Sequence, residues 1–557
     1  MRYGSLAKRV GNAVRLAEVV QVLVRHGFAD LVRRTGLHEG IPARLLRGLR
    51  LIDAPSGEPE TLGARLSAAF SELGPTFIKF GQVMSTRPDL VGVEVAADLG
   101  RLQDRVAPLP FADMEPVIAD SLKAPVADIF AEFDKEPVAA ASLSQVYRAR
   151  LKTGEAVAVK VQRPGALNTI ESDLSLMRRI AEWLTEHVHD LTWIDPVGAV
   201  DEFARSVRRE LDFTTEARVI DRFRKNFDGS QHVFVPRTFP QYTATRVLTM
   251  DWIDGARVDQ LDEYPARHSD PKRVAAIGCE ALCQQVFDHR LFHADPHPGN
   301  ILVLSDNRIA FLDYGMVGHL ERSDAATITD LLRAIIREDA DGCVNAMLAL
   351  TMSIDVERRE ALVHEVSEYL VFEAQTIVSG GQVGRAIERA TELLRRNRLE
   401  LAPRFSLLLK ALATIENVGH TLDPDLDMIP IMQPFVERIV AARYAPAQLM
   451  LEAQSNLSTV LRLGQTIPRD VQSVLRMLRR GQLKIQLNHE GLNHLASVTD
   501  AASNRIAFGV ITGSLIIGSS LLITTNASAR SLGMIGYIIA GLLGLGLVIS
   551  ILRSKNY

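Results

Sequence analysis

The stretch "LFHADPHPGNIL", residues 291–302, contains a histidine, an aspartate and an asparagine at offsets that suit phosphoryl transfer. His293, Asp295 and Asn300 match the pattern H-x-D-x-x-x-x-N. In such a loop Asp295 can accept the proton of an attacking hydroxyl or water, and Asn300 can turn back to ligate Mg²⁺. We therefore predict a catalytic loop, whose acceptor could be water, a lipid or a small molecule.

Asp313 and Lys160 extend this set of chemical groups. Asp313 in "FLDYG" follows the loop at a distance that suits a hairpin, in the position of the aspartate in D-F-G, where its carboxylate would join a metal ion to the nucleotide phosphates. Lys160 ends the apolar strand "VAVK", from which its ammonium could neutralise the α- and β-phosphates. Alone, Lys160 could equally be a surface lysine on an edge strand. The alternative to a catalytic site is a set of capping residues in ordinary loops. That alternative would require lysine, histidine, aspartate, asparagine and aspartate to occur in this order by chance, so we favour the catalytic site.

A carboxylate that pairs with Lys160 is expected on the helical stretch "RRELDFTTEARVIDRF". The stretch offers Glu210, Asp212 and Glu216. If it is one helix of ~3.6 residues per turn, Glu210 and Glu216 point ~120° apart. Both cannot serve the same lysine, so one of them must have another partner.

A phosphate-covering loop is predicted in "PVAAASLSQ", where protein kinases carry G-x-G-x-x-G. Alanine does not easily adopt positive φ, so this turn should be stiffer and present its N–H groups differently to the phosphates. A helical or strand-edge alanine run is the alternative, but the position before "SQVYRARL" favours a loop. The predicted ATP-binding residues are Pro137, Val138, Ala139, Ala140, Ala141, Ser142, Leu143, Ser144, Gln145 and Lys160.

The elements that position these residues form a β-rich region between two helical ones. Residues 1–125 carry apolar residues at helical spacing, whereas residues 126–254 contain a hairpin at "KTGE" and two more strand-like runs. Residues 255–430 read as helical, except around the catalytic loop. The predicted fold is α+β: a bilobal protein-kinase-like fold with an N-terminal helical extension.

Composition describes a globular chain and limits its partners. At 557 residues the chain exceeds a single ordinary core, and its net charge of -4 gives no reason to expect nucleic acid. Three cysteines without zinc-like spacing are expected to be buried thiols. The basic N-terminus reads as an amphipathic helix, not a cleaved signal.

Two charge-free runs near the C-terminus, Ile506–Thr525 and Gly533–Leu552, are long enough to cross a hydrocarbon core of ~30 Å. We predict a transmembrane helical hairpin over residues 506–552, with a buried soluble hairpin as the weaker alternative. The positive-inside rule places the kinase-like domain in the cytoplasm, because Arg530 is the one basic residue in the connection. Residues 431–505 are predicted to be helical, with a basic segment that faces either anionic lipids or solvent. That segment contains Arg462, Arg469, Arg476, Arg479, Arg480 and Lys484.

Between about Leu73 and Gly315 the chain resembles the UbiB family of atypical, protein-kinase-like proteins. The resemblance rests on "KFGQ" (Lys79, Gly81, Gln82), the "AAAS" loop, "ELD" (Glu210, Asp212), "HADPHPGN" and "DYG". The C-terminal hairpin fits bacterial members. The resemblance implies that the extension folds over the cleft and that Lys79 meets Glu210 and Asp212 as a regulatory set, which leaves Glu216 to pair with Lys160.

The resemblance also implies ATP and Mg²⁺ as cofactors and Asp295, Lys160 and Glu216 as catalytic residues, with Asn300 and Asp313 on the metal. It implies ATPase activity that supports ubiquinone biosynthesis at the bacterial inner membrane. Membrane lipids, quinone-precursor lipids and other ubiquinone-biosynthesis proteins would be the partners. Two alternatives stay open: a small-molecule phosphotransferase of the aminoglycoside or choline kinase type, and a scaffold that uses nucleotide as a structural ligand. An older view assigns the family to hydroxylation. This sequence contains no flavin fingerprint or iron-ligand cluster that would support that assignment.

Overall fold

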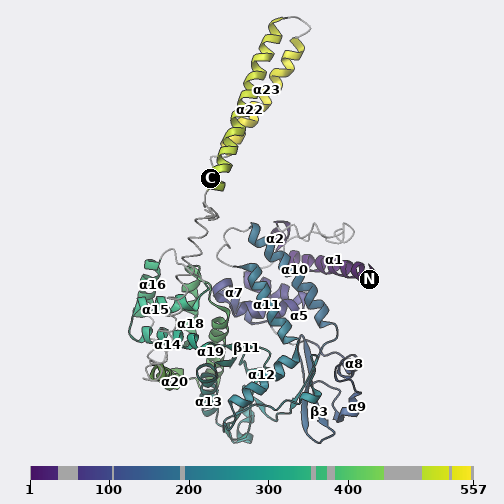
Figure 1. Cartoon of the computed structure of the whole chain (residues 1–557), viewed down its shortest axis with the longest axis vertical. Helices are drawn as coiled ribbons and strands as arrows, with labels where there is room; N and C mark the ends of the chain where they lie inside the picture. Colours follow the sequence, from purple (N-terminus) through teal and green to yellow (C-terminus); the bar gives the residue numbers. More distant parts are fainter. Residues whose placement is uncertain are drawn as a thin grey trace, which may run out of the picture. The chain divides into compact units, whose positions relative to one another are not determined.

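The chain divides into two compact units, Met1–Leu449 and Met450–Tyr557 (Figure 1). This computed structural model describes residues 2–34, 61–102, 106–187, 195–352, 359–372, 383–443, 492–525 and 530–553. The larger unit contains every predicted site residue and is an α+β structure. The basic segment predicted between residues 462 and 484 lies outside the described residues.

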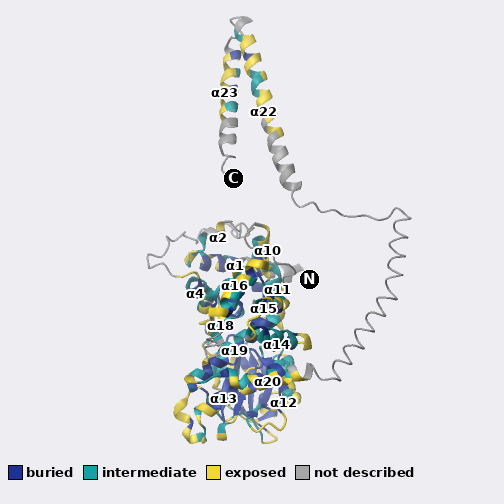
Figure 2. Ribbon diagram, turned by 90° about the vertical axis from the view of Figure 1, so that its left-hand side faces the viewer, coloured by how far each residue is buried: buried dark blue, intermediate teal, exposed yellow. Residues whose placement is uncertain are grey.

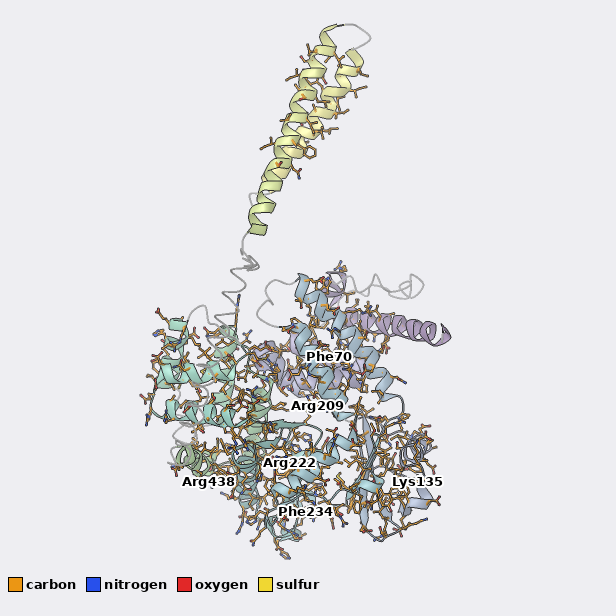
Figure 3. The ribbon with its side chains drawn as sticks, in the orientation of Figure 1. Phe70, Lys135, Arg209, Arg222, Phe234 and Arg438 are labelled. Atoms are coloured by element: carbon orange, nitrogen blue, oxygen red, sulfur yellow. The ribbon has the colours of Figure 1, made fainter. Side chains whose placement is uncertain are left out.

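A helical layer in the larger unit combines the N-terminal extension with two helices from the middle of the chain. Its core is a single apolar cluster, and Phe70 (Figure 3) lies in it with its ring 6.0 Å from those of Phe77 and Phe80. The layer consists of α1 (Arg2–Arg25), α2 (Ala29–Arg34), α4 (Leu62–Leu73), α5 (Pro75–Ser85), α6 (Pro88–Val91), α7 (Val93–Gly100), α10 (Ala166–His187) and α11 (Pro196–Glu210).

The N-lobe is built on a five-stranded antiparallel sheet in which β4 is a central strand between β3 and β6. The turn at "KTGE" joins β3 to β4 as predicted, and Gly154 in it has a φ of 105°, which favours glycine. The lobe contains α8 (Phe111–Leu122), α9 (Val126–Ile129), β1 (Phe130–Phe133), β2 (Ala139–Ala140), β3 (Ser144–Leu151), β4 (Ala156–Gln162) and β6 (Val247–Asp251).

The C-lobe surrounds α13, and in Figure 2 the buried residues gather around this helix and the neighbouring strands. Its strands form two small sheets, β5-β10-β9-β7 and β11-β8. The helices are α12 (Phe213–Asn226), α13 (Pro271–Cys283), the π-helix Gln284–His289, α14 (Arg322–Ile336), α15 (Ala340–Leu350), α16 (Arg359–Phe372), α18 (Val383–Arg396), α19 (Pro403–Leu422) and α20 (Met428–Arg443). The strands are β5 (Val233–Phe234), β7 (Ala256–Arg257), β8 (Leu291–His293), β9 (Ile301–Val303), β10 (Ile309–Phe311) and β11 (Val317–His319).

Two predicted domain boundaries need correction. The boundary at residue 125 assigned α8 to the extension, but Met114 and Ile118 are buried in the same apolar cluster as Tyr147 of the N-lobe sheet. The boundary at residue 430 falls inside α20, whose Phe435 is buried in the C-lobe core. In both cases helical periodicity identified the helix, but periodicity does not say which core a helix packs against.

The smaller unit contains two helices packed on each other, α22 (Leu492–Thr525) and α23 (Arg530–Arg553). Figure 2 colours much of their described surface as exposed, and that surface is apolar at residues such as Ile517, Leu521 and Ile538. Within the described residues one helical window, Ile506–Ile523, is long and apolar enough to cross a membrane. The apolar stretch Leu532–Leu545 of α23 is shorter than that criterion. The predicted transmembrane hairpin therefore stays a prediction.

Candidate active site

Lys160 lies on the central strand β4, not on the edge strand of the alternative interpretation. Its Nζ is 2.9 and 3.0 Å from the two carboxylate oxygens of Glu216 on α12 and 3.0 Å from Oδ1 of Asp313. Burial opposes the charge on Lys160, but the carboxylates of Asp313 and Glu216 outweigh burial and raise its pKa. The ammonium group of Lys160 thus links strand β4 to helix α12 and to the segment after β10 that carries Asp313.

Glu216 and Glu210 lie on two different helices, so the geometric premise of one continuous helix is wrong. Helix α11 ends at Glu210, with Leu211 as its C-cap, and Asp212 is the N-cap of the next helix, α12. Burial, with the nearby carboxylates of Asp313 and Glu210, raises the pKa of Glu216 against the opposing ammonium of Lys160. The side chains of Glu210 and Glu216 still have separate lysine partners, as the sequence argument required.

Lys79 on α5 pairs with Glu210, with 2.6 Å between Nζ and Oε1. The carboxylate of Asp212 accepts hydrogen bonds from Thr214 and Thr215 at the start of α12. Asp212 thus serves as a helix cap, and the contact with Lys79 that the resemblance implied for it stays a prediction.

Gly81 and Gln82 hold α5 against the other extension helices. A Cβ at Gly81 would overlap the side chain of Leu102 and lie 2.9 Å from the ring of Phe70, so the helix approaches this closely only with glycine. Gln82 Nε2 donates a hydrogen bond of 3.4 Å to the Leu102 carbonyl. Within the "KFGQ" motif, Lys79 thus reaches the cleft while Gly81 and Gln82 serve packing.

The peptide groups of the catalytic loop are fixed by His293, which is fully buried. Its Nδ1 accepts the N–H of Asp295 (3.2 Å), so its Nε2 carries the proton and donates to the carbonyl of Leu312 (2.8 Å). Burial lowers the pKa of His293, which keeps this neutral tautomer. The histidine therefore fastens the catalytic loop to the segment that carries Asp313.

The carboxylate of Asp295 meets a lysine from a distant helix. Lys410 on α19 places its Nζ 3.0 Å from Asp295 Oδ1, and His297 Nε2 lies 4.0 Å from Oδ2. Burial alone would raise the pKa of Asp295, but Lys410 and His297 together lower it below its ordinary value. Asp295 is thus held as a carboxylate.

Asn300 and Asp313 lie at the same end of the β9-β10 hairpin, because Ile301 pairs with Phe311 and the N–H of Leu312 bonds to the carbonyl of Asn300 (2.8 Å). Asp313 has a left-handed φ of 51°, and Oδ1 accepts the N–H of Gly315 at 3.2 Å. Burial opposes the charge of Asp313, but Lys160 and then Lys79 outweigh it and lower the pKa.

Tyr314 joins this turn to the helix that carries Glu216. Its ring packs on Phe223 of α12 with 4.9 Å between centroids and on His293 with 5.6 Å. A Cβ at Gly315 would lie 3.1 Å from Asp313 Oδ1 and 3.5 Å from Glu210 Cγ. The DYG segment therefore contacts the catalytic loop and both acid-bearing helices.

The alanine-rich segment forms a tight hairpin in which β2 pairs with β3 and the N–H of Ala141 bonds to the Ser144 carbonyl. Arg163 holds the carbonyls of Ala141 and Leu143. Within the described residues the N–H groups of Ser142 and Leu143 have no hydrogen bond, and the buried Ser142 Oγ has no partner. These donors at the hairpin tip could serve a phosphate.

Two side chains predicted to bind ATP have structural contacts instead. Leu143 is buried in the apolar core of the extension. The amide of Gln145 is fully buried and bonds to both backbone groups of Leu109 and to the hydroxyl of Tyr147. The side chains of Leu143 and Gln145 are occupied by these contacts. Only their backbone groups could therefore contact a nucleotide.

The extension is tied to the C-lobe by a buried charge network that the sequence did not reveal. Arg87 donates to both carboxylate oxygens of Asp89, to Glu400 (3.0 Å) and to the carbonyl of Leu401 (3.2 Å). Asp89 Oδ2 in turn accepts the N–H of Leu401 (3.1 Å). The extension thus contacts α11 through Lys79 and the C-lobe through Arg87 and Asp89.

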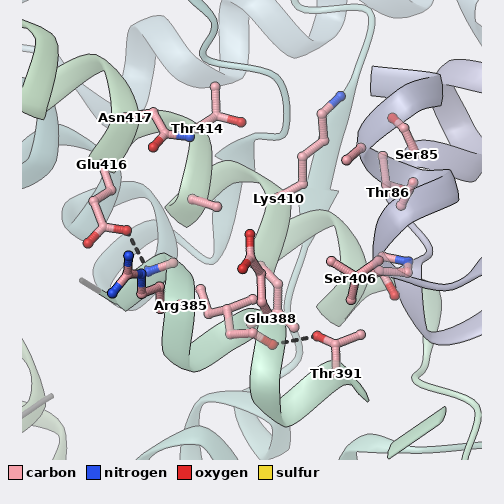
Figure 4. A pocket seen from close by; sticks show the side chains of 18 of the residues that line it. Ser85, Thr86, Arg385, Glu388, Thr391, Ser406, Lys410, Thr414, Glu416 and Asn417 are labelled. Atoms are coloured by element: carbon pink, nitrogen blue, oxygen red, sulfur yellow. Dashed lines mark hydrogen bonds between the residues drawn. The ribbon is translucent and has the colours of Figure 1, made fainter. Parts of the chain in front are cut away.

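A cavity of about 610 Å³ lies between α5 to α7 of the extension and the helices α18 and α19 (Figure 4). Its wall includes the stem of Lys410, and the hydroxyl of Ser406 is buried there without a partner in the described residues. The volume falls in the range of small-molecule sites. Other polar lining residues are Ser85, Thr86, Asp89, Arg385, Glu388, Thr391, Thr414, Glu416, Asn417 and His420.

The family comparisons agree across the chain. Residues 101–347 match the ABC1 atypical kinase-like domain, residues 380–427 the UbiB helical domain and residues 490–553 the ABC1/UbiB kinase-like C-terminal domain. These three matches include the catalytic loop, Lys410 and the C-terminal hairpin. The kinase-like α+β fold predicted from the motifs is thereby confirmed.

Individual relatives show the same likeness. A "Probable protein kinase UbiB" of Cellvibrio japonicus is 35% identical over 79% of this chain and 79% of its own length. An "Uncharacterized protein in hydrogenase 1 5'region" of Clostridium pasteurianum is 31% identical over 98% of this chain and 99% of its own. A solved structure of Rv3197 with erythromycin, from Mycobacterium tuberculosis, has 22% identity and a TM-score of 0.46, covering 66% of this chain and 93% of that one.

Proposed function

The chain belongs to the ABC1/UbiB family of atypical kinase-like proteins, and we propose that its cleft binds ATP with Mg²⁺ and hydrolyses it. The observation that carries the proposal is the position of Lys160 Nζ, which lies 2.9 Å from Glu216 and 3.0 Å from Asp313, at the end of the hairpin that follows the loop of Asp295. A nucleotide phosphate is the natural third partner of such a lysine, since its ammonium lies between a helix acid and a metal-type aspartate.

Asp295 is suited to take the acceptor's proton. The acceptor oxygen forms a bond to the γ-phosphorus as its proton moves to the Asp295 carboxylate. The bond from that phosphorus to the bridging oxygen breaks, and its electron pair leaves with ADP. Lys160 can balance the negative charge of the phosphates during this step.

The donor groups of Asn300 and Asp313 fit Mg²⁺. One carboxylate and one amide oxygen are hard ligands, and the Nδ2 of Asn300 donates to the Asp295 carbonyl (3.2 Å), which leaves its Oδ1 for a metal. Within the described residues no group of three or more His, Cys, Asp or Glu side chains could hold a metal ion. This agrees with Mg²⁺, which keeps water and phosphate ligands. When bound, the ion would neutralise charge on the phosphates.

Membrane attachment through α22 and α23 belongs to the same proposal. The span Ile506–Ile523 has a mean hydropathy of 2.1, and 6% of it is buried within the structure, so its apolar surface is available to lipid. A bacterial inner-membrane location, with the kinase-like domain on the cytoplasmic side, would place ATP turnover beside lipid-soluble substrates. The name UbiB of the relatives supports a role in ubiquinone biosynthesis, with quinone-precursor lipids and other proteins of that process as partners.

Phosphate release from ATP by the full-length protein in anionic-lipid liposomes tests the proposal. We expect Mg²⁺-dependent turnover in the wild type and none in Asp313→Asn. Asp330→Asn, which removes the same charge from an exposed pair with Arg333 at 3.9 Å on α14, is the matched charge control and should turn over normally. ATP binding without turnover in the wild type would contradict hydrolysis and favour the scaffold alternative.

The cavity beside Lys410 favours a second candidate, a small-molecule phosphotransferase. Its hydroxyl-rich wall could hold an alcohol whose oxygen is directed toward Asp295. Phosphate release that needs no added alcohol would contradict this candidate, whereas a strict requirement for one alcohol with stoichiometric phosphorylation of it would support it.

A further inference from the structure

Lys410 occupies a position that the motifs of the catalytic loop do not account for. It lies on α19, inside the region that matches the UbiB helical domain, and its stem lines the cavity in Figure 4. Its Nζ is 3.0 Å from Oδ1 of Asp295, and the two side chains are 22% and 26% exposed. The ammonium group of Lys410, from the helical region, therefore contacts the carboxylate of Asp295 in the catalytic loop.

The loop itself holds the backbone of Asp295 but leaves its carboxylate free. The N–H of Asp295 donates to His293, and its carbonyl accepts from Asn300 (3.2 Å). In the part of the chain that the structure describes, the other titratable groups that act on Asp295 are His293 and His297, and His297 Nε2 stays 4.0 Å from Oδ2. Within the described residues, Lys410 therefore makes the one contact of hydrogen-bond length to this carboxylate.

We propose that Lys410 is a positioning residue that fixes the rotamer of Asp295 for phosphoryl transfer. With Oδ1 engaged by the ammonium, Oδ2 remains open to take the acceptor's proton. A carboxylate pinned at one oxygen has less rotational freedom to lose before reaction, which is the advantage of a preorganised base. The inference rests on the proposed ATP-dependent reaction and names the residue that orients its base.

A purely structural role for Lys410 would be to dock α19 on the catalytic loop. The chain offers a matched control, because Lys272 forms a similar contact of 3.1 Å with Asp423 at the C-terminal end of the same helix. Lys272→Met removes a lysine–carboxylate contact of α19 away from the cleft. Stability effects common to both variants can then be subtracted.

The test compares Lys410→Met, Lys410→Arg and Lys272→Met in the full-length protein in liposomes. We expect Lys410→Met to lower kcat for ATP turnover about tenfold to a hundredfold, with KM for ATP within about twofold of wild type. Lys410→Arg should recover part of the loss, and Lys272→Met should leave kcat unchanged. The same rate for Lys410→Met and Lys272→Met would overturn the inference.

A double variant separates action through Asp295 from a general effect. In an Asp295→Asn background, Lys410→Met should cause no further loss of kcat, because the group it orients is gone. Losses that multiply would show that Lys410 acts elsewhere and would refute the proposal. Absence of turnover in the wild type would instead refute the proposed function.

A cross-link tests the contact without any turnover. A zero-length carbodiimide cross-link between Lys410 and Asp295, detected by mass spectrometry, is expected alongside the one between Lys272 and Asp423. Recovery of the second cross-link without the first would refute the geometry on which the inference depends.

Discussion

Replacing Asp89 by asparagine is expected to loosen the N-terminal extension from the C-lobe. Asp89 is fully buried and accepts hydrogen bonds from Arg87 Nε (3.0 Å), Arg87 Nη2 (2.9 Å) and the N–H of Leu401 (3.1 Å). Asparagine keeps the shape of the side chain but removes its charge and turns one acceptor into a donor. Arg87, which is 5% exposed, would then keep Glu400 as its remaining carboxylate.

The size of the effect follows from the burial of the network. Removing one partner of a buried ion pair costs about 3–5 kcal/mol, because the other charge stays buried. Glu400 remains 3.0 Å from Arg87 and is itself 17% exposed, so we expect a value near the lower end, about 3 kcal/mol. The exposed pair of Arg101 and Asp98 is the control: Arg101 is 81% exposed, and Arg101→Met should cost less than about 1 kcal/mol.

Denaturant unfolding of the full-length protein in detergent measures the free energy, and hydrogen exchange of the Leu401 amide reports the same contact locally. Asp89→Asn should lower the unfolding free energy by about 3 kcal/mol and speed exchange at Leu401, whose N–H loses an ionised acceptor. If Asp89→Asn behaves like Arg101→Met in both measurements, the network does not anchor the extension and the reasoning is wrong.

Four further predictions concern the cleft, the buried thiols and the hairpin. Glu216→Gln should lower ATP turnover about a hundredfold in the phosphate-release assay, because Lys160 loses the acid that holds it; wild-type turnover would contradict this. Burial lowers the pKa of His289, so the unfolded chain binds more protons at this residue than the folded one below about pH 6.5. The unfolding free energy of the wild type minus that of His289→Gln should therefore fall as pH drops from 6.5 to 5.5, and the opposing contribution of the raised Glu216 carboxyl cancels in this difference; a difference that rises instead would refute the neutral assignment. Burial raises the pKa of Cys279 to about 12 and that of Cys343 to about 11, so a thiol reagent at pH 8 should label all three buried cysteines only after unfolding, as counted by mass spectrometry. Ile516→Arg in α22 places a charge that costs about 3 kcal/mol in a bilayer centre and should make the protein extractable by alkaline carbonate, unlike Ile516→Leu.

Local spacing was sufficient to predict that His293, Asp295 and Asn300 lie together, because they belong to one short segment whose geometry depends on neighbours in sequence. The hairpin of β9 and β10 then fixes Asp313 beside it. The break before α12 was missed, although the sequence carries its signal: Asp212 followed by Thr214 and Thr215 is a typical N-cap. Reading the stretch as one helix hid the different role of Asp212.

Contacts between distant segments could not be predicted from periodicity. Arg87 and Leu401 are 314 residues apart, and Lys410 reaches Asp295 from another helix of the C-lobe. A lysine on an amphipathic helix normally reads as solvated, and "STRPDL" reads as a helix end. Such pairs depend on how the helical layer packs against the C-lobe, which the pattern of one chain does not specify.

The two anchors of the extension differ in strength, and this difference determines how the cleft could open. Lys79 and Glu210 form an ion pair whose side chains are 10% and 16% exposed, whereas Asp89 is fully buried and shares several hydrogen bonds with Arg87 and Leu401. Breaking the buried network costs more, so a moving extension should release Lys79 first and pivot about Arg87. Since Lys79 also helps to keep Asp313 ionised, its release would leave that carboxylate with Lys160 as its main cation. Movement of the extension would therefore change the electrostatic environment of Asp313 through Lys79.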